Sequence, residues 1–179
     1  MKTTIQSIRI LIVFTLLTGV LYPLAVTAVA RLGFEKKAGG SLVEHEGKII
    51  GSALLAQKFT GDRYFWPRPS GADYATVASG ASNKGPTSAD LQKAVAERRA
   101  QFGDDAPGDL LTASGSGLDP HISPEAARHQ IPRVAKARGK SEADVAAFVA
   151  RHVEAPQFGF LGEPRVNVFA LNLALDSLP

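Results

Sequence analysis

An uncharged apolar run close to the N-terminus constrains the fold of this chain more than any other feature. Residues 10–30 contain no acidic or basic side chain. A helix of about 21 residues rises about 30 Å, which matches the hydrocarbon core of a bilayer. The sequence therefore predicts a short N-terminal segment at residues 1–9, a transmembrane helix at residues 10–30 and one modest domain within residues 31–179.

The same run is also compatible with a cleaved signal peptide. Lys2 and Arg9 would form its basic n-region, and Ala28-Val29-Ala30 has the small-residue form of a cleavage site. The length favours an anchor and the small-residue ending favours cleavage, so these residues leave both possibilities open. Basic residues flank the run on both sides, and the positive-inside rule gives only a slight lead to a cytoplasmic N-terminus.

The composition excludes several classes of function. The formal net charge is only +3, and beyond residue 30 the basic and acidic side chains nearly balance without a basic run, which argues against nucleic-acid binding. The absence of cysteine excludes disulfides, thiolate catalysis, cysteine metal sites and a lipoprotein anchor. No metal site is predicted, because no His-x-x-x-His or His-Glu-x-x-His spacing occurs among His45, His121, His129 and His152.

Beyond residue 30 the pattern predicts an α+β domain of short strands and about three to four helices. Residues 42–43 and 48–54 flank a turn at Glu46-Gly47 and should form a hairpin. Residues 59–70 contain prolines that fix φ, so this segment should be extended. From Pro164 onward both alternating faces are apolar, which predicts a buried central strand.

Two capping boxes mark the starts of helices. Thr87 with Asp90 predicts a helix at residues 88–101, and Ser141 with Asp144 predicts another. Such boxes satisfy the N–H groups that the first helical turn leaves unpaired, so they indicate where a helix begins.

A further helix is predicted after Ser123-Pro124, which has the usual N-cap and N1 order. It should extend through residues 124–138 to a C-cap at Gly139. Proline lacks the backbone N–H, so a break or kink is expected at Pro132.

The Gly- and Pro-rich loop at residues 111–125 holds the most chemically suggestive side chains. Ser116, Asp119 and His121 have the residue types of a hydrolase triad, so an exported hydrolase using Ser116 and His121 is one hypothesis. Triad members rarely lie within one short loop, and the glycines precede no lysine with P-loop spacing. A rigid loop that folds the domain or docks a partner is therefore the favoured interpretation.

An aromatic segment at residues 64–69 contains the only tryptophan of the chain. Buried aromatic side chains commonly cover a core, whereas Trp and Arg are also enriched at interface hot spots. The segment is therefore either a lid over the core or an anchor for a partner protein. The residues predicted at an interface, from this segment and from the loop, are Trp66, Arg68, Ser116, Asp119 and His121.

A series of short motifs runs along nearly the whole chain. The motifs are Tyr64-Phe65, Arg68-Pro69-Ser70, Ser82-Asn83, Gly85-Pro86-Thr87, Ser114-Gly115-Ser116-Gly117-Leu118-Asp119-Pro120-His121-Ile122-Ser123-Pro124, Arg133-Val134-Ala135-Lys136-Ala137-Arg138-Gly139, Gly162-Glu163-Pro164-Arg165-Val166-Asn167-Val168 and Leu171-Asn172-Leu173-Ala174-Leu175. In this order they resemble the KdpC family, the C subunit of the potassium-transporting Kdp P-type ATPase, and so many matches in the same order are specific.

The resemblance implies a non-catalytic subunit of a high-affinity, ATP-driven potassium import complex. It favours an anchor in the cell inner membrane, with a cytoplasmic N-terminus and a periplasmic α+β domain. The implied partners are a channel-like potassium-translocating subunit and a P-type ATP-hydrolysing subunit, with membrane lipid around the helix. The chain has neither Asp-Lys-Thr-Gly nor a P-loop, and one helix cannot form a potassium pore, so hydrolysis and conduction must lie in partners.

The family has also been described as a catalytic chaperone that raises the affinity of the hydrolysing subunit for ATP. ATP would then be met through the complex, and no cofactor is assigned to this chain itself. Ala81 replaces the second glycine of the family's Ser-Gly-Gly-Ser-Asn, and a periplasmic domain does not meet cytoplasmic ATP, which both argue against direct contact. The candidate nucleotide contacts are Ser79, Gly80, Ser82, Asn83 and Gln130.

Overall fold

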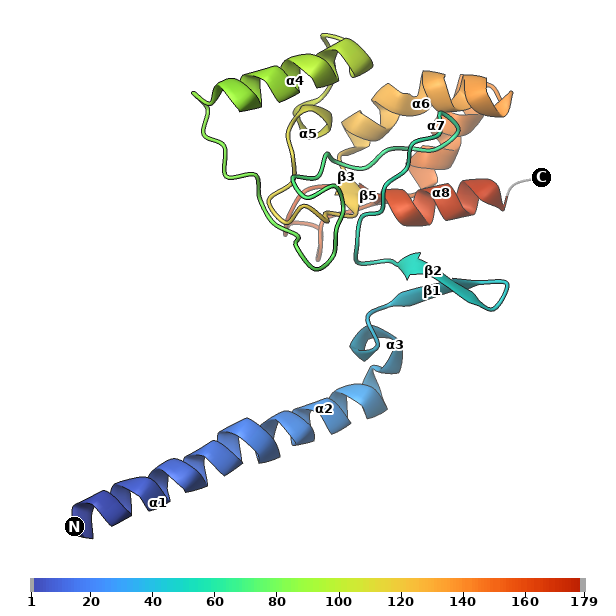
Figure 1. The fold of residues 1–179 in the computed structure, drawn as a ribbon. Coiled ribbons are helices and arrows are strands. Elements are labelled where there is room, and N and C mark those ends of the chain that lie inside the picture. The colour runs from blue at the N-terminus through green and yellow to red at the C-terminus, as the bar shows by residue number, and fades with distance from the viewer. Residues whose placement is uncertain (1, 178–179) are drawn as a thin grey trace. The chain divides into compact units, whose positions relative to one another are not determined.

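The computed structural model describes residues 2–177 of the chain. The chain divides between Ser52 and Ala53 into two compact units (Figure 1). The first unit holds the apolar N-terminal helix and a hairpin, and the second holds a small α+β domain. The fold class predicted from the sequence, one long apolar helix followed by mixed strands and helices, is therefore confirmed.

The N-terminal helix runs without interruption from Lys2 to Gly33 and is apolar enough to cross a membrane. It consists of α1 (Lys2–Leu16), a π-helical turn η1 (Leu17–Leu21) and α2 (Tyr22–Gly33). The π-helical turn has a local cause, because Pro23 has no N–H to donate to the carbonyl of Gly19. The helix continues past both ends of the predicted span at residues 10–30.

The helix surface suits apolar surroundings. Its side chains are strongly apolar over most of its length, and none of that apolar stretch is buried within the protein. Two hydroxyl groups inside the span donate back to the helix, Thr18 Oγ1 to Phe14 O and Thr27 Oγ1 to Pro23 O, each at 2.7 Å. These bonds spare the hydroxyl groups the cost of being unpaired in lipid.

A short helix α3 (Glu35–Ala38) and the predicted hairpin complete the first unit. Strand β1 (Leu42–His45) pairs antiparallel with β2 (Lys48–Ser52). The turn residues Glu46 and Gly47 have φ values of 50° and 73°, the positive pair that a two-residue hairpin turn requires. The hairpin prediction is confirmed, although β2 ends at Ser52 and not at residue 54.

The second unit contains five helices and three short strands within its described residues. The helices are α4 (Ala89–Phe102), α5 (Gly108–Leu111), α6 (Pro124–Arg138), α7 (Glu142–Arg151) and α8 (Val168–Asp176). The strands β3 (His121–Ile122), β4 (Val153–Glu154) and β5 (Arg165–Asn167) form an antiparallel sheet in the order β3-β5-β4. Helix α4 is joined to α5 by a hydrogen bond of 2.7 Å from Arg98 Nη1 to Leu111 O.

The core of this unit lies between α6, α7, α8 and the extended segment at residues 59–70. Removing the apolar side chains of this core from water is the main source of the domain's stability. The buried cluster comprises Phe65, Leu110, Ile122, Ala126, Ala127, Ile131, Val134, Ala135, Val145, Phe148, Val149, Val166, Val168, Leu171 and Leu175.

The extended segment has two buried amide side chains as its hydrogen-bond partners. Asn172 of α8 pairs with both backbone groups of Phe65, accepting at 2.8 Å and donating at 2.9 Å. Gln130 of α6 does the same for Trp66, at 2.8 and 3.1 Å. A buried extended chain needs partners for its N–H and C=O groups, and an amide side chain can serve both because it has a donor and an acceptor. The predicted extended segment is shorter than residues 59–70, because residues 61–64 form a turn in which the Tyr64 N–H donates to Gly61 O at 3.1 Å. Residues 65–70 are neither helix nor strand, and Phe65 lies in the core.

The most C-terminal prediction is wrong. Only Arg165–Asn167 forms the predicted central strand, and the following residues, Val168–Asp176, form helix α8. Asn167 accepts a hydrogen bond from the N–H of Ala170 at 3.0 Å and so caps α8. A short apolar run does not distinguish a buried strand from a buried helix, and the Leu and Ala residues after the cap favour the helix.

Two further expectations are corrected. Of the expected break or kink, the break does not occur, because α6 is one helix through Pro132. Pro132 and Arg128 are both exposed, so water can satisfy the carbonyl that proline leaves unpaired. Helix α4 is capped by Ser88, whose side chain accepts from Leu91 N, and not by Thr87. The caps at Ser141 and Gly139 are confirmed.

Candidate functional site

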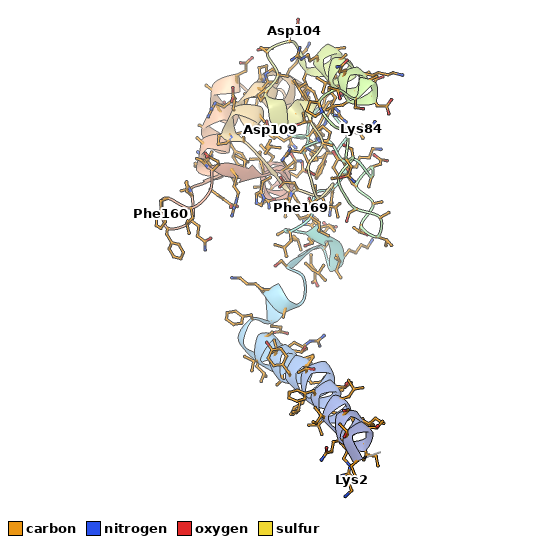
Figure 2. The ribbon with its side chains drawn as sticks, turned by 90° about the vertical axis from the view of Figure 1, so that its left-hand side faces the viewer. Lys2, Lys84, Asp104, Asp109, Phe160 and Phe169 are labelled. Carbon is orange, nitrogen blue, oxygen red and sulfur yellow. The ribbon has the colours of Figure 1, made fainter. Side chains whose placement is uncertain are left out.

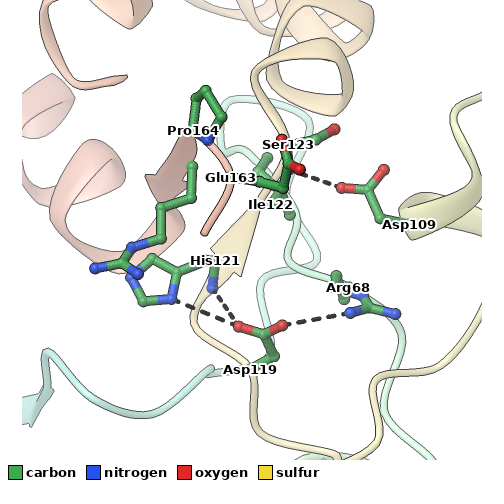
Figure 3. Close-up of a pocket in the computed structure, with 9 residues that line it drawn as sticks. Arg68, Asp109, Asp119, His121, Ile122, Ser123, Glu163 and Pro164 are labelled. Atoms are coloured by element: carbon green, nitrogen blue, oxygen red, sulfur yellow. Dashed lines mark hydrogen bonds and ion pairs between the residues drawn. The ribbon is translucent and has the colours of Figure 1, made fainter. Parts of the chain in front are cut away.

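A pocket of about 370 Å³ lies where four segments of the second unit meet (Figure 3). The segments are the extended chain around Arg68, the start of α5, the loop that leads through β3 into α6, and the chain that enters β5. Antiparallel pairing of His121 with Asn167 brings the last two segments together. The lining residues are Arg68, Asp109, Asp119, His121, Ile122, Ser123, Glu163, Pro164 and Arg165.

Asp119 connects the two sides of this pocket (Figure 3). Its Oδ1 accepts the backbone N–H of His121 at 3.0 Å and lies 3.6 Å from the imidazole Nδ1 of the same residue. Its Oδ2 lies 3.4 Å from Nη1 of Arg68. The first bond closes a turn that an aspartate typically forms with the residue two positions ahead. One carboxylate thus fixes the loop and holds Arg68 and His121 at the pocket wall.

The charge state of Asp119 follows from these contacts. Partial burial raises the pKa of the Asp119 carboxyl, but the hydrogen bonds from His121 and the positive charge of Arg68 outweigh it, so the pKa is lowered overall. The side chain is therefore an anion at neutral pH.

Asp109 ties α5 to the start of α6. Its Oδ2 accepts the backbone N–H of Ser123 at 2.7 Å. Ser123 in turn accepts the N–H of Ala126 at 3.0 Å and caps α6, with Pro124 at the first helical position. This confirms the cap and proline order that the sequence predicts.

Arg68 is held by its backbone as well as by Asp119. The hydroxyl of Tyr74 donates to the carbonyl oxygen of Arg68 at 2.9 Å, and burial together with the charge of Asp73 raises the pKa of Tyr74 to about 12. Among the described residues, the buried Nε of Arg68 has no hydrogen-bond partner. A 3.4 Å contact to Asp119 is long for a hydrogen bond, so the guanidinium retains donor capacity at the pocket.

The arrangement does not form a nucleophile and base. Ser116 Oγ accepts the N–H of Leu118 at 3.1 Å, and Ser116 does not line the pocket. His121 faces Asp119, and no hydrogen bond joins it to Ser116 within residues 2–177. Hydrolysis by a triad requires the imidazole on the nucleophilic oxygen, so nothing in this geometry supports the hydrolase hypothesis. In the same described range, no group of three His, Asp or Glu side chains could hold a metal ion.

The five residues predicted at an interface fall into two groups. Arg68, Asp119 and His121 meet at the pocket, whereas Trp66 and Ser116 lie outside its lining. The indole of Trp66 has the guanidinium of Arg133 over its ring at 3.9 Å and the Phe102 ring edge-on at 5.6 Å, and its Nε1 donates to Gly61 O. Trp66 thus packs within the domain and remains half-buried.

The candidate nucleotide contacts do not form one cluster of exposed side chains. Ser79, Ser82 and Asn83 are exposed on a loop whose Gly80 packs tightly on Gly117. A Cβ at Gly117 would lie 2.9 Å from Gly80 O, and the φ of 70° at Gly117 also favours glycine. Gln130, by contrast, is only 1% exposed and binds the backbone of Trp66.

Sequence reasoning missed three charged residues of the pocket, Asp109, Glu163 and Arg165. Glu163 and Arg165 belong to one of the motifs noted above, but no local pattern places that motif beside Asp119. Their proximity depends on the pairing of β3 with β5, which joins residues far apart in the sequence.

Comparisons with known proteins identify the family. The family described as KdpC, the K+-transporting ATPase c chain, matches residues 4–177. The potassium-transporting ATPase KdpC subunit of Geobacter sulfurreducens is 50% identical over 187 residues, which cover 99% of each chain. The KdpC subunit of Sorangium cellulosum is 55% identical over 180 residues, 95% of each chain. That of Kineococcus radiotolerans is 55% identical over 181 residues, 96% of this chain and 91% of the relative.

A family match over almost the full length, with identities of this size, agrees with the motifs and with the pocket that they line. The chain therefore belongs to the KdpC family and is an accessory, non-catalytic subunit of the potassium-transporting ATPase.

Proposed function

We propose that this chain assembles with a channel-like potassium-translocating subunit and a P-type ATP-hydrolysing subunit, and that it docks through the pocket at Asp119. In this proposal the helix Lys2–Gly33 anchors the chain in the inner membrane, with the N-terminus in the cytoplasm and the α+β domain in the periplasm. The role is to assemble and stabilise the import complex.

The observation that carries the docking proposal is the state of Arg68. Its guanidinium is held at a pocket wall by Asp119 while its buried Nε has no partner among the described residues. The buried Nε itself is out of reach of a partner, but the side chain of Arg68 is 28% exposed and its contact with Asp119 is long at 3.4 Å, so its terminal N–H groups can donate to a partner at the pocket. Glu163 and Arg165, both exposed, lie beside it and offer further polar contacts.

The length and composition of the N-terminal helix support the anchor. At a rise of about 1.5 Å per residue, its 32 residues span about 48 Å, more than the hydrocarbon core needs. The helix also continues through Ala28–Ala30, the segment with the form of a cleavage site.

The docking proposal is tested by purifying the complex from membranes that contain Asp119→Ala or His121→Ala in the full-length chain. We expect each variant to reduce recovery of the partner subunits about five-fold or more, because Asp119→Ala leaves Arg68 unpaired and His121→Ala removes the imidazole that faces Asp119 at the pocket wall. Asp90→Ala is the matched control, since Asp90 forms an exposed ion pair with Lys84 that is worth little and does not line the pocket.

Thermal unfolding of the purified variants separates lost docking from lost folding. If both variants recover the partner subunits and take up potassium as well as the wild type does, Asp119 and His121 are not part of the interface.

The catalytic chaperone function stays a prediction taken from the family resemblance. What supports it here is limited to the exposed loop that carries Ser79, Ser82 and Asn83. The KM of the hydrolysing subunit for ATP, measured with and without this chain, is the corresponding assay. An unchanged KM would restrict the role to assembly.

A further inference from the structure

A loop between β4 and β5 presents large apolar side chains to solvent. Phe158 and Phe160 are 78% and 76% exposed, and Leu161 is 50% exposed. Among the described residues of the second unit, Leu54 and Val77 are the other large apolar side chains classed as exposed. Figure 2 shows Phe160 on a loop that projects from the body of this unit. Grouped exposed apolar side chains of this kind mark an interaction surface.

The loop is ordered by its own backbone. Gln157 and Leu161 pair as an isolated bridge, with both N–H···O bonds at 2.9 Å, and the Gly159 N–H donates to Pro156 O at 2.9 Å. At its base, Glu154 pairs with Arg165 through the strands and through a 3.0 Å ion pair. The two rings are therefore presented on a fixed turn.

The turn places Phe158 in a conformation that a phenylalanine rarely adopts. Phe158 has a φ of 55° and Gly159 a φ of 83°. The left-handed region costs a non-glycine residue roughly 1–2 kcal/mol, and glycine or asparagine would relieve that cost. A bulky aromatic side chain that is exposed at a strained position gains nothing from the fold itself, which indicates a role outside it.

The chemistry of the loop favours a protein surface over a lipid surface. Residues 155–162 contain no charged side chain and neither Trp nor Tyr. Peripheral membrane contacts usually combine apolar residues with Lys or Arg, and Trp and Tyr are the residues enriched at the lipid headgroup level. Two rings on a preorganised turn instead resemble the aromatic anchors that fill pockets in protein interfaces.

The loop also continues directly into the pocket. Glu163, Pro164 and Arg165, which follow Gly162, line the pocket around Asp119. A partner that covers the pocket from this side would meet the loop as well.

We infer that Phe158 and Phe160 insert into an apolar cleft on another subunit of the potassium-transporting ATPase, the same partner that covers the Asp119 pocket. This inference rests on the proposed function, because it needs an assembled complex. It adds the anchoring residues and the apolar chemistry of the partner's surface.

The first test replaces both rings in the full-length chain, Phe158→Ser with Phe160→Ser, and measures recovery of partner subunits from solubilised membranes. We expect recovery to fall about ten-fold or more, as is typical for loss of aromatic hot spots. Val77→Ser is the matched control, since Val77 is equally apolar and fully exposed on another loop. Recovery within two-fold of the wild type, roughly the scatter of neutral interface substitutions, would overturn the inference.

The second test leaves the fold and the docking pocket unaltered. A photo-crosslinking phenylalanine analogue at position 160 is activated in intact membranes, and the products are identified by mass spectrometry. A covalent product with another subunit of the ATPase supports the inference, whereas products with phospholipid alone, or none, contradict it. If the wild-type chain itself recovers no partner, the proposed function fails; if it does and only these two tests are negative, the inference alone fails.

Discussion

Single polar side chains determine the path of the chain through this domain. Asp119 links His121 to Arg68, while Gln130 and Asn172 each pair with the backbone of one residue in the extended segment. The sequence identified Asp119 by its residue type and its place in a rigid loop. For Gln130 the sequence suggested only a nucleotide contact. Its burial could not be predicted, because no local pattern shows that an amide in a helix will pair with a segment more than sixty residues away.

The contacts of Asp119 predict a specific dependence on pH. Because its pKa is lower in the folded protein than the value of about 3.9 expected in the unfolded chain, its contribution to stability is present above that value. The contribution is lost as the pH falls through the lower, folded pKa. We therefore expect the gap in melting temperature between wild type and Asp119→Asn to be largest near neutral pH and to close under acid conditions.

Thermal unfolding of the full-length chain in detergent, from about pH 7 to about pH 3, measures this gap. Asparagine keeps an acceptor for the N–H of His121, so the loop should retain its turn. A gap that stays constant over this range would show that Asp119 stabilises the fold through shape and not through its charge.

Local signals in the sequence found most of the elements and misplaced a few. Caps and turns predicted the hairpin and the starts of α6 and α7, because these depend on neighbouring residues. The residues of α8 predict a strand because they are apolar on all sides, and such a run shows neither the 3.6-residue period of a helix nor the alternation of a half-buried strand. The continuity of α6 past Pro132 depends on solvent around that turn, which the residue type does not reveal.

The corrected cap of α4 gives a test at this scale. Ser88 Oγ accepts the N–H of Leu91 at 3.4 Å, a long hydrogen bond, so Ser88→Ala should destabilise the first turn of α4 by about 0.5 kcal/mol, roughly a two-fold loss of amide protection. Thr87→Ala is the matched control and should leave protection unchanged, because Thr87 is exposed and does not cap the helix. Hydrogen exchange of the α4 amides measures the protection in both variants. An equal loss in the two, or a larger loss for Thr87→Ala, would show that Thr87 caps α4, as the sequence predicts.

The whole molecule combines an apolar helix with a domain that has a polar pocket and an exposed aromatic loop. Sequence reasoning reached three pocket residues, Arg68, Asp119 and His121, because they lie in conspicuous motifs. It could not reach Glu163 and Arg165, which join the pocket through the pairing of β3 with β5, or Asp109, which joins it through its hydrogen bond with Ser123. The exposed pair Phe158 and Phe160 was also missed, since exposure of an apolar residue follows from the fold.

The most direct test of this account is affinity purification of the full-length chain from potassium-starved membranes, followed by mass spectrometry of every chain recovered. The account predicts an intact N-terminus that retains residues 1–30, together with a channel-like subunit and a P-type hydrolytic subunit in fixed ratio. Recovery of a chain that begins after Ala30, free in the periplasm and without partners, would contradict it.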